Sequence, residues 1–171
     1  TLTAANSTAL TDGAAAVFLA SEDWVKKNGL EAMAYFVDAQ VSAVDIRHEG
    51  LLMAPAYAVP KLIARNNMKL QDFDFYEIHE AFAAQVLCTL KAWESPEFCK
   101  QKLKLAGPLG SIDRSKMNIK GGSVALGHPF GATGARLVAT LAKILNQNGK
   151  GRGLISVCTG GGMGVTAILE K

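Results

Sequence analysis

Residues 119–141 read IKGGSVALGHPFGATGARLVATL, a glycine-rich turn that leads into an apolar helix. At its centre His128 stands between Gly127 and Pro129. The proline favours an extended backbone at His128, and the glycines let another segment or a ligand come close. A nucleotide site is one interpretation, but the spacing is not GxGxxG and no acidic ribose partner follows about 20 residues on. Two readings remain: an imidazole presented into a pocket, or a histidine bonded within a tight loop.

Strands and helices alternate around this turn. Apolar or β-branched runs predict strands at 13–21, 34–46, 72–79, 153–158 and 164–170. Helical spacing predicts helices at 22–30, 54–68, 80–93 and 134–149, and residues 94–117 are expected to be a polar connection. The last two strands are separated by TGGGM, which predicts a hairpin. The sequence therefore indicates an α/β layered domain with a mixed five-stranded sheet covered by helices.

Composition excludes several classes of protein. The 171 residues are 49% hydrophobic and carry a net charge of +3 with no run of five like charges, so neither disorder nor nucleic-acid binding is indicated. No apolar run approaches the roughly 20 residues of a transmembrane helix, and no leader is visible. The three cysteines form no CxxC pair. We expect free thiols, no transmembrane segment and a cytoplasmic location, with the mitochondrial matrix as the eukaryotic alternative.

Two further segments carry unusual chemistry where a strand ends. In EIHEAFAAQ (77–85), His79 closes a strand and Glu80 is expected to favour the N-terminus of the following helix. In CTGGGMG (158–164), Cys158 is either a buried inert thiol or a thiol that faces a cleft, with the N–H of Gly160 near an oxyanion. A zinc site built from the histidines and Cys158 is not favoured, because their separations match no common ligand motif. We predict no metal site.

Together these segments resemble the C-terminal part of the thiolase family, of the 3-ketoacyl-CoA thiolase or acetyl-CoA acetyltransferase type. HEAFAAQ, GGSVALGHPFGATGAR and CTGGGMG are similar to three signatures of that family, in the family's order. The opening TLTAANSTALTDGAAAVFLASE is similar to the segment that ends the family's N-terminal half. The resemblance implies that 1–25 is the end of a truncated N-terminal domain. It also implies that 26–171 is the C-terminal domain, half of an α-β-α-β-α arrangement.

The resemblance implies an acyltransferase that cleaves 3-ketoacyl-CoA with CoA, or condenses two acyl-CoAs in reverse. Cys158 would be the acid/base thiol, and His128 would activate the nucleophilic cysteine and hold a thioester oxygen. The N–H of Gly160 would contribute to an oxyanion hole. His79 stands where short-chain members have Asn and would hold a water at the enolate oxygen or contact that oxygen; HEAFA resembles the trifunctional branch of fatty-acid β-oxidation. The substrate-binding residues implied are Ala4, Thr8, Met53, Ala81 and Phe82.

No segment resembles the family's nucleophilic-cysteine motif, so the chain alone is expected to lack turnover. Implied substrates are acyl-CoA and CoA, with no permanently bound cofactor. Implied partners are the N-terminal half, further copies in a dimer or tetramer, and a β-oxidation multifunctional subunit, with no nucleic acid. Two alternatives stay open: a decarboxylating condensing enzyme, against which Cys158 argues, and a non-catalytic CoA- or acyl-binding or structural half-domain.

Overall fold

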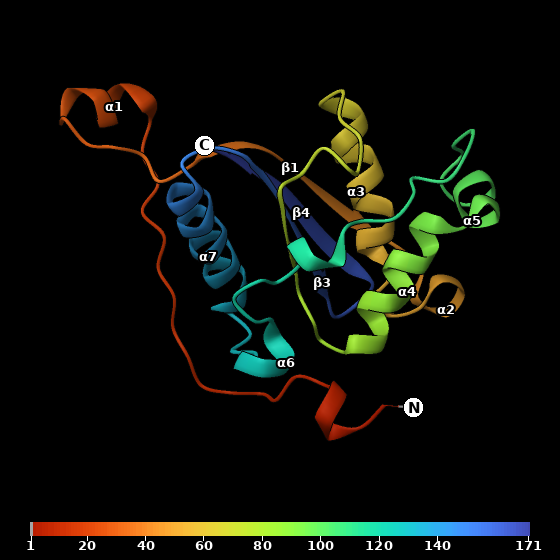
Figure 1. Ribbon diagram of the computed structural model, residues 1–171. Coiled ribbons are helices and arrows are strands. Elements are labelled where there is room, and N and C mark those ends of the chain that lie inside the picture. The colour runs from red at the N-terminus through yellow and green to blue at the C-terminus, as the bar shows by residue number, and fades with distance from the viewer. Residues whose placement is uncertain (1) are drawn as a thin grey trace.

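The computed structural model of the chain describes residues 2–171 and centres on one mixed sheet (Figure 1). The strand order is β1-β4-β3-β2. β2 (Phe75–Ile78) runs parallel to β3 (Arg152–Thr159), and β3 pairs antiparallel with β4 (Met163–Glu170). β1 (Tyr35–Ala43) pairs antiparallel with β4 and forms one edge of the sheet. The parallel β2–β3 pair places the ends of these two strands side by side.

Helices cover both faces of the sheet because successive strand residues point to opposite sides. α7 (Thr133–Asn148) packs on one face, and α3 (Ala54–Arg65) and α4 (Ala83–Glu94) pack on the other (Figure 1). The neighbours Leu154 and Ile155 therefore belong to different cores, the first beneath α3 and α4 and the second beneath α7. Both are almost fully buried. The two cores hold the sheet as the middle layer of a three-layer α/β fold.

Short elements complete the chain around these layers. They are η1 (Ala4–Asn6), α1 (Glu22–Lys27), α2 (Ile46–Glu49), α5 (Pro96–Gln101), η2 (Arg114–Lys116) and α6 (Ser123–Leu126). The connection 94–117, expected to be polar, contains α5 and η2. The sequence signal for α5 is Ser95 followed by Pro96, an N-cap whose side chain accepts from the N–H of Phe98.

Two expected turns are confirmed. α7 ends at Gly149, whose left-handed backbone (φ 78°) closes the helix. The β3–β4 hairpin turns through Gly161 and Gly162, which both have positive φ. The N–H of Val44 donates to the carbonyl of Gly162, so the hairpin is tied to the segment that follows β1.

The expected strand at 13–21 is wrong, and the sheet of residues 2–171 has four strands instead of five. The segment is unpaired and runs along the outside of the molecule from η1 to α1 (Figure 1). Phe18 and Leu19 are 77% and 76% exposed. A strand needs a neighbour that accepts its backbone hydrogen bonds, and none pairs with this segment in the described chain. The apolar run alone could not reveal that.

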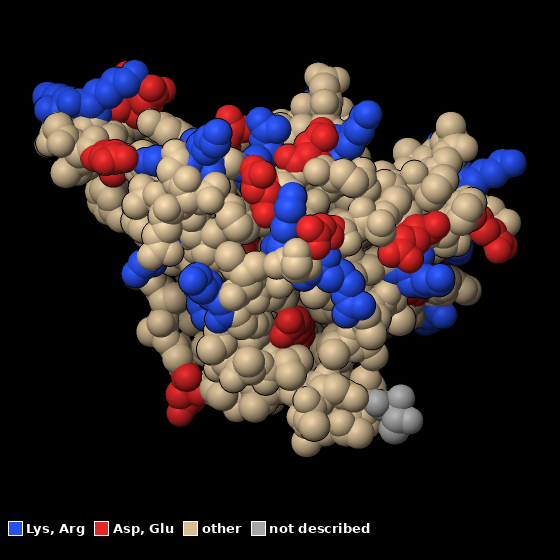
Figure 2. Space-filling view, in the orientation of Figure 1, with Lys and Arg blue, Asp and Glu red and all other residues tan. Residues whose placement is uncertain are grey.

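The charged side chains form a mixed surface. Acidic and basic side chains are intermixed on the face shown in Figure 2. Among residues 2–171, no helix combines the length and the apolar character that crossing a bilayer requires.

Candidate active site

The three segments that contain His79, His128 and Cys158 meet where β2 and β3 end. His79 follows β2 directly, and its N–H donates to the carbonyl of Ser156 on β3 (2.8 Å). Cys158 lies two residues further along β3, close to its end. The turn before α7 brings His128 against His79, with 4.2 Å between their ring centroids. The structure therefore brings together the three side chains that the sequence singled out.

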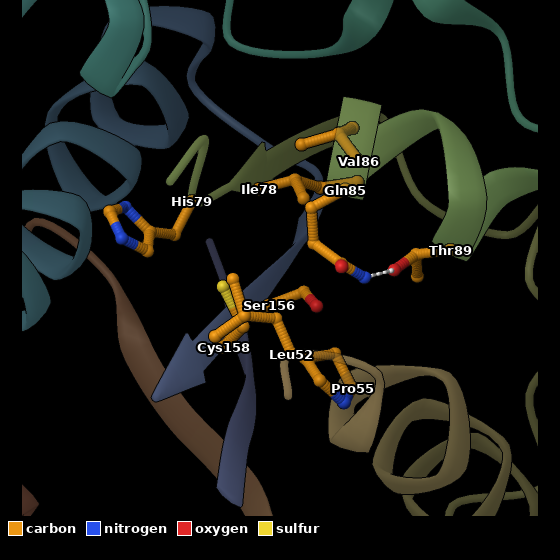
Figure 3. Close-up of a pocket in the computed structure, with 9 residues that line it drawn as sticks. All are labelled: Leu52, Pro55, Ile78, His79, Gln85, Val86, Thr89, Ser156 and Cys158. Atoms are coloured by element: carbon orange, nitrogen blue, oxygen red, sulfur yellow. Dashed lines mark hydrogen bonds between the residues drawn. The ribbon is translucent and has the colours of Figure 1, made fainter. Parts of the chain in front are cut away.

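A small pocket lies beside these residues on the α3/α4 face (Figure 3). Cys158 and Ser156 line it from β3, and His79 lies at its edge. Its remaining lining comes from the end of β2, from α4 and from the segment around the start of α3: Ile78, Gln85, Val86, Thr89, Leu52 and Pro55. The lining combines apolar side chains with four polar ones, His79, Gln85, Thr89 and Ser156, so a polar group that enters finds partners there.

The backbone of His128 is held by the N-terminal segment. Its N–H donates to the carbonyl of Ala9 (2.9 Å), and it forms a parallel bridge with Leu10. This is the extended conformation that Pro129 predicts. A side chain on Gly127 would collide with Thr11, because an added Cβ would lie 2.6 Å from its methyl carbon. The expectation that glycines admit another segment is thus confirmed, and residues 9–11 are that segment.

The hydrogen bonds of His128 define which ring nitrogen carries the proton. Its Nδ1 lies 2.7 Å from Oγ1 of Thr133, and that hydroxyl donates to the carbonyl of Pro129 (3.1 Å). Since the hydroxyl proton is already used, Thr133 accepts from Nδ1–H. The Nε2 atom of His128 is then unprotonated and can accept a proton. Burial, followed by the charge of Arg136, lowers the pKa of His128 and keeps the ring neutral at pH 7.

His79 and Cys158 are also held in their neutral forms. His79 is 2% exposed, and burial, then His128 and Arg136, lowers its pKa to about 4. Cys158 is 8% exposed, and burial raises its pKa to about 11, although the backbone groups of Cys158 and Ala81 act in the opposite direction. A neutral thiol can give a proton to a carbanion-like centre and take it back.

Glu80 serves a different helix from the one expected. α4 begins at Ala83, so Glu80 does not head it. Its carboxylate accepts from the N–H of Val124 at the start of α6 (3.1 Å) and from Nδ2 of Asn118 (2.6 Å). Asn118 also bonds both backbone groups of Ile78, at 2.8 and 2.9 Å. The glycine turn is thereby fastened to the end of β2.

The expected substrate-binding residues lie in three places. Thr8, Ala81 and Phe82 adjoin the glycine turn: the N–H of Thr8 donates to Ala81, and Ser7 bridges Phe82. The hydroxyl of Thr8 donates to the carbonyl of Ser123 (2.7 Å). Met53, at the start of α3, accepts from Gln85 of the pocket (3.1 Å). Ala4 is exposed on η1, and Gly160 is exposed in the β3–β4 turn.

The remaining cysteines and His48 lie elsewhere. Cys88 is exposed on α4, and Cys99 is buried, with its thiol directed at the carbonyls of Ala92 and Trp93. His48 is on α2, beside Asp45. In the part of the chain that the structure describes, no group of three or more His, Cys, Asp or Glu side chains could hold a metal ion.

The polar side chains behind the two histidines were not predicted from the sequence. Ser123, Thr133 and Arg136 all lie within the quoted glycine-rich stretch, and Glu77 immediately precedes the end of β2. Glu77 is 1% exposed, and burial raises its pKa to about 7 although Arg136 lowers it. The available signal was polar residues inside segments otherwise built of small and apolar ones, since a buried polar group needs a partner.

Comparison with known proteins agrees with this arrangement. Residues 30–171 match the family described as "Thiolase, C-terminal domain". The chain is 45% identical over 170 residues to a 3-ketoacyl-CoA thiolase of Shewanella sp. (strain W3-18-1) and 46% identical to one of Pectobacterium carotovorum. Each alignment covers 99% of this chain and 39% of the relative, so the chain spans about two fifths of these relatives' length.

Solved structures give the same result. The crystal structure of a Bacillus anthracis acetyl-CoA acetyltransferase matches with a TM-score of 0.80 and 38% identity, over 99% of this chain and 38% of that one. Human mitochondrial 3-ketoacyl-CoA thiolase in complex with CoA matches with a TM-score of 0.76 and 33% identity, at the same coverage. The chain belongs to the thiolase family, and its residues 30–171 are that family's C-terminal domain.

Proposed function

We propose that this chain supplies the acid/base part of a thiolase active site. The observation that carries the proposal is the convergence of two neutral imidazoles and one neutral thiol where β2 and β3 end. Cys158 would exchange a proton with the α-carbon of a CoA thioester, and His128 would accept the proton of the attacking cysteine. His79 would face the enolate oxygen, and the N–H of Gly160 would face the acyl oxyanion.

The protonation states suit thiolysis. A nucleophilic thiol gives its proton to Nε2 of His128 and attacks the 3-keto carbon. The carbon–carbon bond then breaks, its electron pair forms the acetyl-CoA enolate, and the Cys158 thiol protonates that carbon. The Cys158 thiolate next takes the proton of the incoming CoA thiol, whose sulfur attacks the acyl group. The nucleophilic sulfur leaves and recovers its proton from His128, which restores every group.

The nucleophile must come from outside this chain. Neither Cys88 nor Cys99 lines the pocket, and Cys99 is buried in a different part of the core. We assign 1–25 to the end of an N-terminal domain that carries the nucleophile and 26–171 to the C-terminal domain. Phe18, Leu19 and Trp24 are exposed, and the tilted rings of Phe18 and Trp24 lie 5.5 Å apart; this apolar surface supports a partner domain along the segment.

The relatives suggest the substrate. One matching structure contains CoA, and the relatives' names refer to 3-ketoacyl-CoA and acetyl-CoA. We assign Ala4, Thr8, Ala81 and Phe82 to the pantetheine channel and Met53 to the surroundings of the acyl group. We further propose a homo-oligomer, a dimer or tetramer, that works in the cytoplasm or the mitochondrial matrix on β-oxidation intermediates, with a multifunctional subunit as partner.

Thiolysis of a 3-ketoacyl-CoA tests the proposal. The full-length protein that contains this chain should consume the substrate only when CoA is present. Cys158→Ala and His128→Asn should each lower kcat by about 10²- to 10⁴-fold, the usual contribution of a proton-transfer group. Cys88→Ala, which changes an exposed thiol on α4, is the matched control and should retain activity. CoA binding without any turnover would favour the binding-module alternative, and thiolysis by residues 1–171 alone would refute the external nucleophile.

A further inference from the structure

A continuous line of hydrogen-bonded side chains runs from the half-buried Arg136 on α7 through Ser123 to His79. Nη2 of Arg136 donates to Oγ of Ser123 (2.9 Å), and the same Oγ lies 2.9 Å from Nδ1 of His79. Ser123 is fully buried and His79 is 2% exposed. The proton on the Ser123 hydroxyl therefore has a restricted choice of acceptors.

The direction of these bonds follows from donor counting. Arginine only donates, so Ser123 accepts from Arg136. If Nδ1–H of His79 also donated to Ser123, the buried hydroxyl proton would have no acceptor among the described residues. An unpaired buried donor is costly, whereas a bond from the Ser123 hydroxyl to an unprotonated Nδ1 gives a partner to the hydroxyl proton and to Nδ1 alike. The neutral ring then carries its proton on Nε2.

The hydrogen bonds therefore favour opposite tautomers in the two histidines. Thr133 uses its proton on Pro129 and accepts from Nδ1–H of His128, whereas Ser123 accepts from Arg136 and donates to Nδ1 of His79. Nε2 is thus a bare acceptor on His128 and a donor on His79. Within residues 2–171, no protein group is bonded to Nε2 of His79, so its proton is free for a ligand.

We propose that Arg136 is a positioning residue that acts through Ser123 to fix the Nε2–H tautomer of His79. Glu77 lies behind Arg136 with Oε2 unpaired, and Nε and Nη1 of Arg136 are also unpaired. In the described chain the guanidinium is therefore hydrogen-bonded only through Nη2, to the hydroxyl of Ser123. The consequence for catalysis rests on the proposed function: an Nε2–H donor beside the pocket would stabilise an enolate oxygen.

The tautomer can be measured without turnover. In the purified protein with ¹⁵N-labelled histidine, long-range ¹H–¹⁵N spectra at pH 7 should show His79 as Nε2–H. Ser123→Ala should lower the ratio of Nε2–H to Nδ1–H by about tenfold, the effect of losing one hydrogen bond. Ser123→Thr, which keeps the hydroxyl, should retain the wild-type ratio. An Nδ1–H tautomer in the wild type, or an unchanged ratio in Ser123→Ala, would overturn the proposal.

A second set of variants separates Arg136 from Ser123. The double variant Glu77→Gln/Arg136→Met removes the guanidinium donor without leaving a buried charge. Ser123 is then free to accept from Nδ1–H of His79, so the ratio of Nε2–H to Nδ1–H should fall toward one. Thr133→Val is the reciprocal control and should change the tautomer of His128 only. Ser42→Ala, at a buried serine of β1, should change neither ring. If Ser123→Ala does not fold, the double variant decides the question.

Turnover distinguishes this inference from the proposed function. In the full-length protein, Ser123→Ala should lower kcat about tenfold with little change in KM, because the donor acts in the transition state. A changed tautomer with unchanged kcat would support the positioning and refute the assigned role of His79. An unchanged tautomer would refute the positioning whatever the kcat.

Discussion

Replacing Glu77 by glutamine should make the fold sensitive to acid between pH 7 and pH 5. Two buried groups now oppose each other in this range. His79 has a pKa of about 4 against its ordinary 6.5, so the unfolded chain binds its proton more tightly and stability falls as the pH falls. Glu77 has a pKa of about 7 against its ordinary 4.5, so the folded chain binds its proton more tightly and stability rises as the pH falls.

The two effects nearly cancel in the wild type. With these values, linkage gives a loss of about 2 kcal/mol from His79 between pH 7 and pH 5 and a gain of about 2 kcal/mol from Glu77. Both side chains are at most 2% exposed, so solvent screening does not reduce these figures greatly. Glu77→Gln removes the gain and leaves the loss. His79→Asn removes the loss, so that variant should gain about 2 kcal/mol over the same interval.

Urea unfolding followed by circular dichroism at pH 5, 6 and 7 measures these differences. Relative to the wild type, Glu77→Gln should lose about 2 kcal/mol on going to pH 5, and His79→Asn should gain about 2 kcal/mol. His128, whose pKa is also lowered, adds the same loss to all three proteins. Glu94→Gln, at an exposed glutamate of α4, is the control for removing a carboxylate and should follow the wild type. A Glu77→Gln profile parallel to that of the wild type would show that Glu77 is not protonated in the folded state, and the reasoning would fail.

Two other predictions concern backbone geometry. Gly162→Ala should lower the free energy of unfolding by about 2–4 kcal/mol in urea titrations, because φ is +77° and an added Cβ would lie 2.5 Å from the carbonyl oxygen of Val44. Gly134→Ala, in α7 with open space around it, is its control and should stabilise slightly or not at all. Asn118→Ala should cost about 2–5 kcal/mol, since both backbone groups of Ile78 lose a buried partner; amide exchange at Ile78 should accelerate in the same variant.

Periodicity predicted the elements whose own residues determine them. The α7 helix needs only its apolar spacing and Gly149, and the β3–β4 hairpin needs only its glycines. The 13–21 segment failed because an apolar run does not show whether a neighbouring strand is present to receive it. The start of α4 was misplaced by three residues because Glu80 is a plausible first-turn residue by composition, while its carboxylate in fact bonds α6.

The candidate site also contains residues that the sequence predicts and residues that only the structure reveals. His79, His128 and Cys158 stand out because a titratable residue beside glycine or at a strand end is unusual in an apolar segment. Ser123, Thr133 and Arg136 are ordinary residues for a loop and a helix, and only their distances reveal their partners. Spacing along the chain carries no information about which nitrogen of a ring faces which hydroxyl.

The glycines of the opening stretch can be explained by packing alone. An added Cβ on Gly122 would lie 2.2 Å from the carboxyl group of Glu80, and one on Gly127 would lie 2.6 Å from Thr11. These contacts are where the turn meets the end of β2 on one side and the N-terminal segment on the other. A turn with side chains at both points would stand away from β2, and Ser123 could not then reach His79. Glycine at these positions therefore holds the hydroxyl within bonding distance of the ring, a role that needs no bound phosphate.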